Sequence, residues 1–225
     1  MSSAGYSGAM SSELRPSPLG LAVLGLLQVG PLHPYGIQRL IKLWGKDQVV
    51  NVGPRANLYR MINRLHEADL IAVRQTERDQ LFPERTVYEL TDAGRIAARE
   101  WLTAMLSATK YEFPEFPAAL SFIMGLTPEE SLAVLGQRAE ALRHRIAQLD
   151  RELADLSDTL PRVTLLETEY LRAVTDAELQ WVKSVAADLR SGSLTWSYED
   201  FEAVIASDEA SLEAIDPEPR ASPDT

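Results

Sequence analysis

The strongest constraint on the fold is a long apolar repeat in the second half of the chain. Its members alternate spacings of four and three residues, the pattern of a coiled-coil seam: Leu135, Ala139, Leu142, Ile146, Leu149, Leu153 and Leu156. Thr127 and Glu130 precede the repeat with the spacing of a capping box. A helix from Pro128 to Leu156 would be about 43 Å long, longer than a small domain is wide, so its apolar side needs a partner helix.

A second long helix is expected over residues 163–190, after Pro161, with apolar residues again at helical spacing. The two helices could pair within one chain or with those of a second chain, and both arrangements stay open. We favour a homodimer through residues 115–190. Its predicted interface is Leu135, Leu142, Ile146, Leu149, Leu153, Leu156, Leu166, Tyr170, Val174 and Trp181.

The first half has a different pattern. Three helices are expected, starting at Ser17, Pro34 and Gly53-Pro54, with Gly30-Pro31, Gly45 and Ala68 near their ends. Two β-branched, aromatic segments (70–77 and 85–91) then predict a hairpin with a protruding loop. A further helix follows Thr91 and Asp92 and ends near Ser107.

This order of elements predicts a mainly α fold with a small β-hairpin. A winged helix-turn-helix domain is followed by a helical, coiled-coil-like dimerisation domain. The expected parts are a disordered lead (1–16), the DNA-binding domain (17–110), the dimerisation domain (111–191) and an acidic, disordered tail (192–225).

Charge is distributed unevenly along the chain. The whole carries a net charge of −11, but residues 1–110 hold 13 Lys and Arg against 10 Asp and Glu. Residues 111–225 hold 9 against 23, so the first part is mildly basic and the second strongly acidic. The asymmetry suggests a basic face in the first half, although chance together with an acidic tail would give a similar balance.

Several classes of function find no support. The chain has no cysteine, which excludes disulfides, a thiol nucleophile and thiolate metal sites. It has no Gly-rich phosphate loop and no GxSxG motif, and its three widely spaced histidines predict no metal site. No apolar run is long enough to span a bilayer, and the start lacks the features of a signal peptide. We therefore expect a cytoplasmic protein that is not an enzyme, with no cofactor, no metal and no membrane partner.

The third helix carries the best functional signal. With Leu58 at the centre of its buried side, Met61, Ile62 and Leu65 also face inward. The residues that point outward are Ala56, Asn57, Arg60, Asn63, Arg64 and Glu67. Arg pairs bidentately with guanine and Asn with adenine in the major groove, whereas an ordinary solvated face would be richer in Lys and Glu.

Flanking residues complete the predicted interface with double-stranded DNA. Lys42 and Lys46 are expected at phosphates, and the loop of the hairpin against the adjacent backbone or minor groove. The full predicted set is Tyr35, Lys42, Lys46, Arg55, Ala56, Asn57, Tyr59, Arg60, Asn63, Arg64, Arg78, Gln80 and Arg85.

Three stretches of residues 17–100 resemble the PadR family of bacterial transcriptional repressors in order and spacing. They are GLAVLGLLQVGPLHPYGIQRLI, NLYRMINRLHEADLI and ERTVYELTDAGR. The short cues are Pro34-Tyr35-Gly36, Leu58-Tyr59 and Tyr88-x-Leu90-Thr91-x-x-Gly94. Asp69 departs from the family, which often has glycine before the first wing strand. Residues 115–190 resemble the helical dimerisation domain of the longer PadR subfamily.

The resemblance implies a homodimer that binds a pseudo-palindromic operator, blocks transcription and is often released by a small aromatic molecule. Aromatic residues near the expected junction of the two domains suggest a pocket for such an effector: Trp101, Tyr111, Phe113, Phe116 and Phe122. They would equally serve as ordinary packing. The alternative function is a winged-helix and coiled-coil module that binds protein partners without reading DNA.

Overall fold

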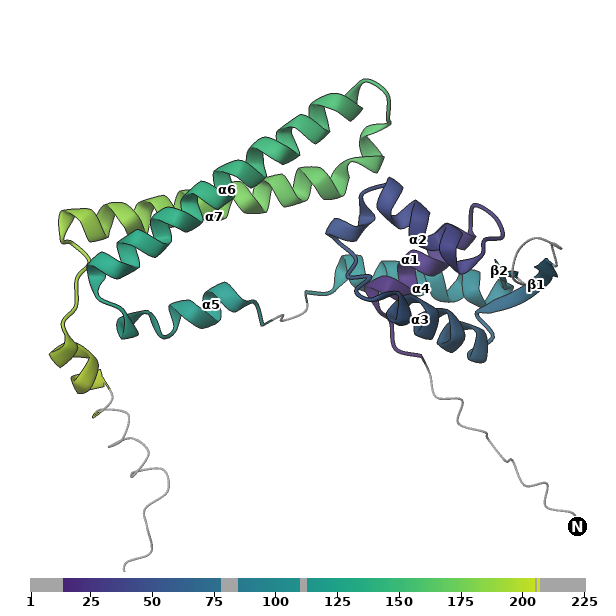
Figure 1. Cartoon of the computed structure of the whole chain (residues 1–225), viewed down its shortest axis with the longest axis horizontal. Coiled ribbons are helices and arrows are strands. Elements are labelled where there is room, and N and C mark those ends of the chain that lie inside the picture. The colour runs from purple at the N-terminus through teal and green to yellow at the C-terminus, as the bar shows by residue number, and fades with distance from the viewer. Residues whose placement is uncertain (1–13, 78–84, 110–112, 205, 207–225) are drawn as a thin grey trace, which may run out of the picture. The chain divides into compact units, whose positions relative to one another are not determined.

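The computed structural model describes residues 14–77, 85–109, 113–204 and 206, and it divides into two units (Figure 1). The first unit is Met1–Tyr111 and the second is Glu112–Thr225. The fold class is the one predicted: mainly helical, with one two-stranded antiparallel hairpin and a pair of long helices.

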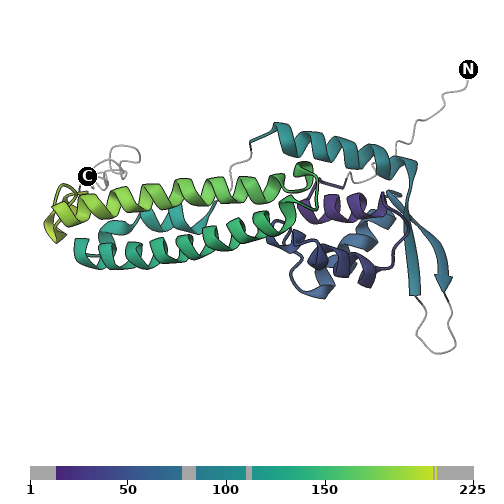
Figure 2. The same cartoon turned by 90° about the horizontal axis from the view of Figure 1, so that it is seen from above.

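The first unit has the helix-helix-helix-hairpin-helix order expected from the sequence. Its elements are α1 (Pro18–Leu27), α2 (Pro34–Leu43), the 3-10 turn η1 (Lys46–Gln48), α3 (Arg55–Glu67), β1 (Ile71–Glu77), β2 (Arg85–Leu90) and α4 (Asp92–Ser107). Figure 2 shows the two strands extending away from the helices of this unit. Each α-helix except α3 begins with a side-chain cap, from Ser17, His33 and Thr91.

One core joins α1, α2, α3 and the base of the hairpin. Val23 and Leu24 of α1 and Ile37 of α2 are fully buried there, together with the inner side of α3. The strands pair Ile71 with Leu90, and a bulge between Val73 and Gln75 shifts the register. This core holds α3 against three other elements.

The turn between α3 and β1 explains the departure at Asp69. Asp69 has φ of 56°, in the left-handed region where glycine is favoured and aspartate is tolerated. The Thr91 hydroxyl donates to the carbonyls of Asp69 and Leu70 at 2.7 and 3.0 Å. Aspartate therefore occupies a left-handed turn position that would suit glycine.

The second unit is a helical hairpin with a short preceding helix. Its elements are α5 (Glu115–Leu120), the 3-10 turns η2 (Ile123–Gly125) and η3 (Arg162–Thr164), α6 (Pro128–Ser157) and α7 (Leu166–Ser191). The capping box predicted at the start of α6 is present, and the Thr127 backbone N–H donates to the Glu130 carboxylate at 2.8 Å. That bond lowers the pKa of Glu130 below its ordinary value.

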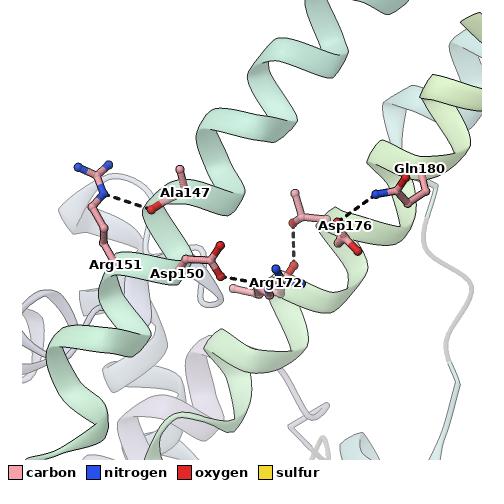
Figure 3. A network of polar contacts seen from close by, with 8 residues as sticks. Ala147, Asp150, Arg151, Arg172, Asp176 and Gln180 are labelled. Atoms are coloured by element: carbon pink, nitrogen blue, oxygen red, sulfur yellow. Dashed lines mark hydrogen bonds and ion pairs between the residues drawn. The ribbon is translucent and has the colours of Figure 1, made fainter.

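The helices α6 and α7 run side by side in both views (Figures 1 and 2). Leu135 and Leu149 of α6 and Val182 of α7 are buried. Ion pairs cross the hairpin: Arg172 bonds Asp150 at 2.9 Å (Figure 3), and Arg138 donates to Glu178 at 2.6 Å. The α6 seam is thus covered by α7 of the same chain, which is the arrangement that the sequence left as an alternative to pairing between chains.

The segment after α7 packs on the same hairpin. The Trp196 indole N–H donates to the Leu126 carbonyl at 2.8 Å, and its ring lies against the core of the second unit. Residues 198–204 form a short helix. This part of the predicted tail, 192–204, is therefore attached to the hairpin through Trp196.

Two glycines in helices give a matched pair of stability predictions. A Cβ on Gly94 would lie 1.9 Å from the Leu70 carbonyl oxygen, whereas a Cβ on Gly25 meets nothing within 4 Å. Gly94→Ala should lower the free energy of unfolding by about 1–3 kcal/mol or more. Gly25→Ala should raise it by about 0.5–1 kcal/mol, as measured by urea denaturation. Equal effects of the two substitutions would contradict the close approach of α4 to Leu70.

Ser131 of α6 gives a second stability prediction. Its hydroxyl is fully buried and has no hydrogen-bond partner among the described residues. Ser131→Ala should raise the free energy of unfolding by about 1 kcal/mol, since a buried unpaired hydroxyl is unfavourable. Ser184→Ala, at an exposed site on α7, makes the same change in helix propensity and should raise it less. A larger gain at Ser184 would show that the Ser131 hydroxyl is satisfied.

Candidate nucleic-acid interface

The helix α3 presents one apolar side and one polar side, as predicted. Leu58, Met61, Ile62 and Leu65 are buried. The exposed residues of its predicted DNA-binding set are Arg55, Ala56, Tyr59, Arg60, Asn63 and Arg64. Asn57 is half-buried, and Glu67 is exposed at the C-terminal end of the helix. The packing of α3 thus leaves the Arg and Asn side chains facing solvent.

The start of α3 is organised by Gly53, Asn57 and Arg60. Gly53 has φ of 55°, and a Cβ there would lie 2.5 Å from the Asn57 amide nitrogen. The Arg60 guanidinium donates to the Asn57 side-chain oxygen. Asn57 and Arg60 are therefore held together on the exposed side, while Arg60 keeps further N–H donors free for a base edge.

The helix α2 and the turn η1 after it carry three residues of the predicted DNA-binding set. Tyr35 lies in its first turn and is 59% exposed, beside the capping residue His33 at a ring distance of 6.0 Å. Lys42 is exposed in the last turn, and Lys46 is half-buried at the start of η1. Tyr35 and Lys42 lie on α2, which packs against the same core as α3.

The loop of the hairpin falls largely outside the description. Arg78 and Gln80 are not among the described residues. For Arg85 only the backbone is described, which pairs with Glu77 at the far end of the ladder. An additional cation in the hairpin is Arg74, at the bulge, which lies 3.8 Å from Glu89.

Arg15 is a cation near α3 that the sequence analysis missed. It lies just before α1, in the segment taken as a disordered lead, and it lines a hollow with Arg64. The sequence gives no structural signal for Arg15, because the segment around it has no hydrophobic periodicity. Its position depends on Ser17, which caps α1 by accepting from the Gly20 N–H at 3.1 Å, and on Leu14, which packs on the core.

The predicted dimerisation residues fall into two groups. On α6, Leu135 and Leu149 are buried, and Leu142, Ile146, Leu153 and Leu156 are half-buried. On α7, all four predicted residues are exposed: Leu166, Tyr170, Val174 and Trp181. The α6 seam is therefore covered within the chain, so its leucines do not by themselves require a second chain. The α7 residues form the uncovered apolar stripe.

The aromatic residues predicted to line an effector pocket belong to different surroundings. Trp101 is buried in the core of the first unit. Phe116 packs edge-on against Trp181 at 5.9 Å and lies under the Arg138 guanidinium. Phe113 and Phe122 are exposed, and Tyr111 lies outside the described residues. Phe116 thus contacts Trp181, which is one of the predicted dimerisation residues.

The described residues show neither a metal site nor a membrane-spanning helix. Among them, no group of three or more His, Asp and Glu side chains is placed to hold a metal ion. In the described part of the chain, no helix combines the length and apolarity needed to cross a membrane.

The sequence of the first unit matches a known protein family. Residues 23–100 match the transcriptional regulator PadR-like family. The match covers 78 of the 225 residues, and over this region the chain is similar to the PadR-like family. The matched residues include α3, the hairpin and most of α4, so the PadR-like region is the part that carries the candidate interface. The family consists of transcriptional regulators rather than enzymes.

Solved structures share the fold over about three quarters of this chain. Bacillus subtilis PadR in complex with operator DNA matches with a TM-score of 0.63 at 20% identity, over 76% of this chain and 97% of that chain. The same protein in complex with p-coumaric acid matches with 0.61 at 19% identity, over 77% and 96%. The Vibrio cholerae virulence activator AphA matches with 0.60 at 22% identity, over 77% and 98%. No curated protein matches the sequence.

Proposed function

We propose that this PadR-like regulator is a homodimeric repressor that binds a specific operator in double-stranded DNA. The observation that carries the proposal is the exposed side of α3, where Arg60, Asn63 and Arg64 stand on a helix fixed by its buried side. A helix of this size fits the major groove, and these side chains match guanine and adenine edges.

Each part of the interface has a distinct role in this proposal. Arg55, Ala56, Asn57, Tyr59, Arg60, Asn63 and Arg64 of α3 lie in or beside the major groove. Tyr35, Lys42 and Lys46 contact phosphates and set the register of α3. The wing residues Arg78, Gln80 and Arg85 lie against the adjacent backbone or minor groove. Phosphate contacts provide affinity, and the contacts of α3 provide sequence discrimination.

The second copy is assigned to the uncovered stripe of α7. Tyr170 is 68% exposed and Trp181 46% exposed, with Leu166 and Val174 on the same side of the helix. A contiguous apolar stripe of this kind is typical of a protein–protein contact. A dimer with two-fold symmetry pairs the same stripe from both chains and places two α3 helices on a pseudo-palindromic operator.

Repression and release follow from the same arrangement. A dimer seated on its operator covers promoter DNA, so transcription is blocked while it is bound. The p-coumaric acid complex of Bacillus subtilis PadR supports a small aromatic molecule as the releasing effector. The gene beside this one on the chromosome is the first candidate target.

A second candidate is a protein-interaction module that does not read DNA. The acidic second half, with a net charge of −14 over residues 111–225, favours it. The two functions differ in their response to salt. Binding to operator DNA must weaken steeply as salt rises, because phosphate neutralisation releases counterions. A flat salt dependence would favour the interaction module.

The DNA contact is tested by two substitutions with different signatures. Arg60→Ala should weaken operator binding by about 1–3 kcal/mol, roughly 5–150-fold, and relax specificity at one base position. Lys42→Ala should weaken binding to all sequences alike and reduce the salt slope by about one. The measurement is a gel-shift titration on the promoter region at several salt concentrations, with transcription in vitro as the readout of repression.

Arg99→Ala is the matched control, because Arg99 is exposed on α4 and is not in the predicted DNA-binding set. It should bind like the unaltered protein. Footprinting should reveal two half-sites whose centres lie about 10 base pairs, or a multiple of that, apart. An asymmetric footprint, or an Arg60→Ala protein that binds normally, would contradict the assignment of α3.

The dimer contact is tested on α7. Sedimentation should give close to twice the 25.0 kDa chain mass. Tyr170→Glu with Val174→Glu places two charges in the apolar stripe and should give the mass of one chain, with the helix content unchanged. Tyr198→Glu, at a residue that is 73% exposed beyond the stripe, should leave the dimer intact. A double variant that still sediments as a dimer would move the interface elsewhere.

A further inference from the structure

The first unit contains a hollow that shares one residue, Arg64, with the proposed DNA contact. Its volume is about 950 Å³, and it lies between the segment before α1, the C-terminal half of α3, and α4. This volume is at the upper end of the range for small-molecule sites. All of its walls belong to the first unit, and its lining includes Trp101, one of the aromatic residues predicted to line an effector pocket.

The inner wall of the hollow is apolar. Trp101 is 7% exposed and lines the hollow, together with Leu70 and Ala97. Leu14 packs on the core from the segment before α1. A flat apolar or aromatic group can therefore be removed from water against this wall.

The rim of the hollow is charged and balanced. It carries two guanidinium groups, Arg15 and Arg64, and two carboxylates, Glu67 and Glu100. Among the described residues, no ion pair or side-chain hydrogen bond engages any of these four side chains. A ligand could therefore bind them without first breaking a contact within the protein.

We propose that this hollow binds a zwitterionic aromatic molecule of the amino-acid type. The aromatic ring lies against Trp101, the carboxylate binds Arg15 and Arg64, and the ammonium binds Glu67 and Glu100. A purely anionic or purely cationic ligand would satisfy one pair of charges and face repulsion from the other. A zwitterion neutralises both pairs, and hydrogen bonds between charged partners are the strongest of the common kinds.

The position of Arg64 would connect this site to DNA. Arg64 belongs to the predicted DNA-binding set on α3 and also lines the hollow. A guanidinium engaged by a ligand carboxylate is no longer free for a base or a phosphate. Bound ligand should therefore weaken operator binding, and by reciprocity operator should weaken ligand binding. This coupling rests on the proposed function, whereas binding of the ligand does not.

The test uses three probes that share an indole ring and differ in charge. Calorimetric titration of the full chain compares L-tryptophan, indole-3-propionate and tryptamine. L-tryptophan should bind at least tenfold more tightly than either of the others, because each lacks one of the two charged contacts. Equal affinities for the three, or no binding of L-tryptophan, would overturn the proposal.

Variants place the binding in the hollow. Arg15→Gln and Glu100→Gln should each weaken L-tryptophan binding about tenfold, and both residues are exposed, so the fold should be retained. Arg99→Gln, the neighbour of Glu100 outside the hollow, should bind as the unaltered chain does. Normal binding by both rim variants would overturn the assigned site.

Operator binding is measured on the same protein with and without L-tryptophan. A chain that binds L-tryptophan but no DNA would refute the proposed function and leave the ligand site standing. A chain that binds DNA but no L-tryptophan would refute the ligand site and leave the proposed function standing. Operator affinity that is unchanged by saturating L-tryptophan would overturn the coupling through Arg64.

Discussion

Burial of Leu58, Met61, Ile62 and Leu65 holds α3 in one rotational setting, and the candidate interface depends on this setting. A helix turns 100° per residue, so the four inward residues determine which side chains face outward. The core that receives them includes α1, α2 and the base of the hairpin. Rotation of α3 would expose apolar side chains and bury Arg60 or Asn63 without partners, which is unfavourable on both counts.

The contact between the β-hairpin and α4 holds the C-terminal end of α3 in the same rotational setting. Thr91 connects them: its hydroxyl donates to the carbonyls that end the turn after α3 and accepts from the Gly94 N–H at 2.9 Å. Gly94 allows the helix to approach the Leu70 carbonyl, where a Cβ has no room. The end of α3, the turn at Asp69 and the start of α4 therefore form one hydrogen-bonded joint, and the hollow beside Trp101 lies next to it.

The second unit handles its apolar residues differently. The α6 leucines pack against α7 of the same chain. The Arg138–Glu178 and Arg172–Asp150 ion pairs fix the register of the two helices. Both pairs are partly exposed, so they contribute less to stability than the buried leucines and mainly set the alignment. Once α6 is covered, an apolar side of α7 stays exposed.

The sequence by itself determined the elements and the exposed side of α3. Period, proline and glycine positions, and capping residues predicted the order of helices and strands, because those signals act over a few neighbouring residues. The helical wheel of α3 predicted its buried side for the same reason.

Tertiary structure alone decided which helix covers the α6 seam, because identical apolar spacing suits a partner from the same chain or another chain. It also placed Trp101 in the core of the first unit and Phe116 against the core of the second, and it brought Arg15, Arg64 and Glu100 to one hollow across 85 residues of sequence. Such groupings arise from the packing of distant segments, and no local pattern of residues records them.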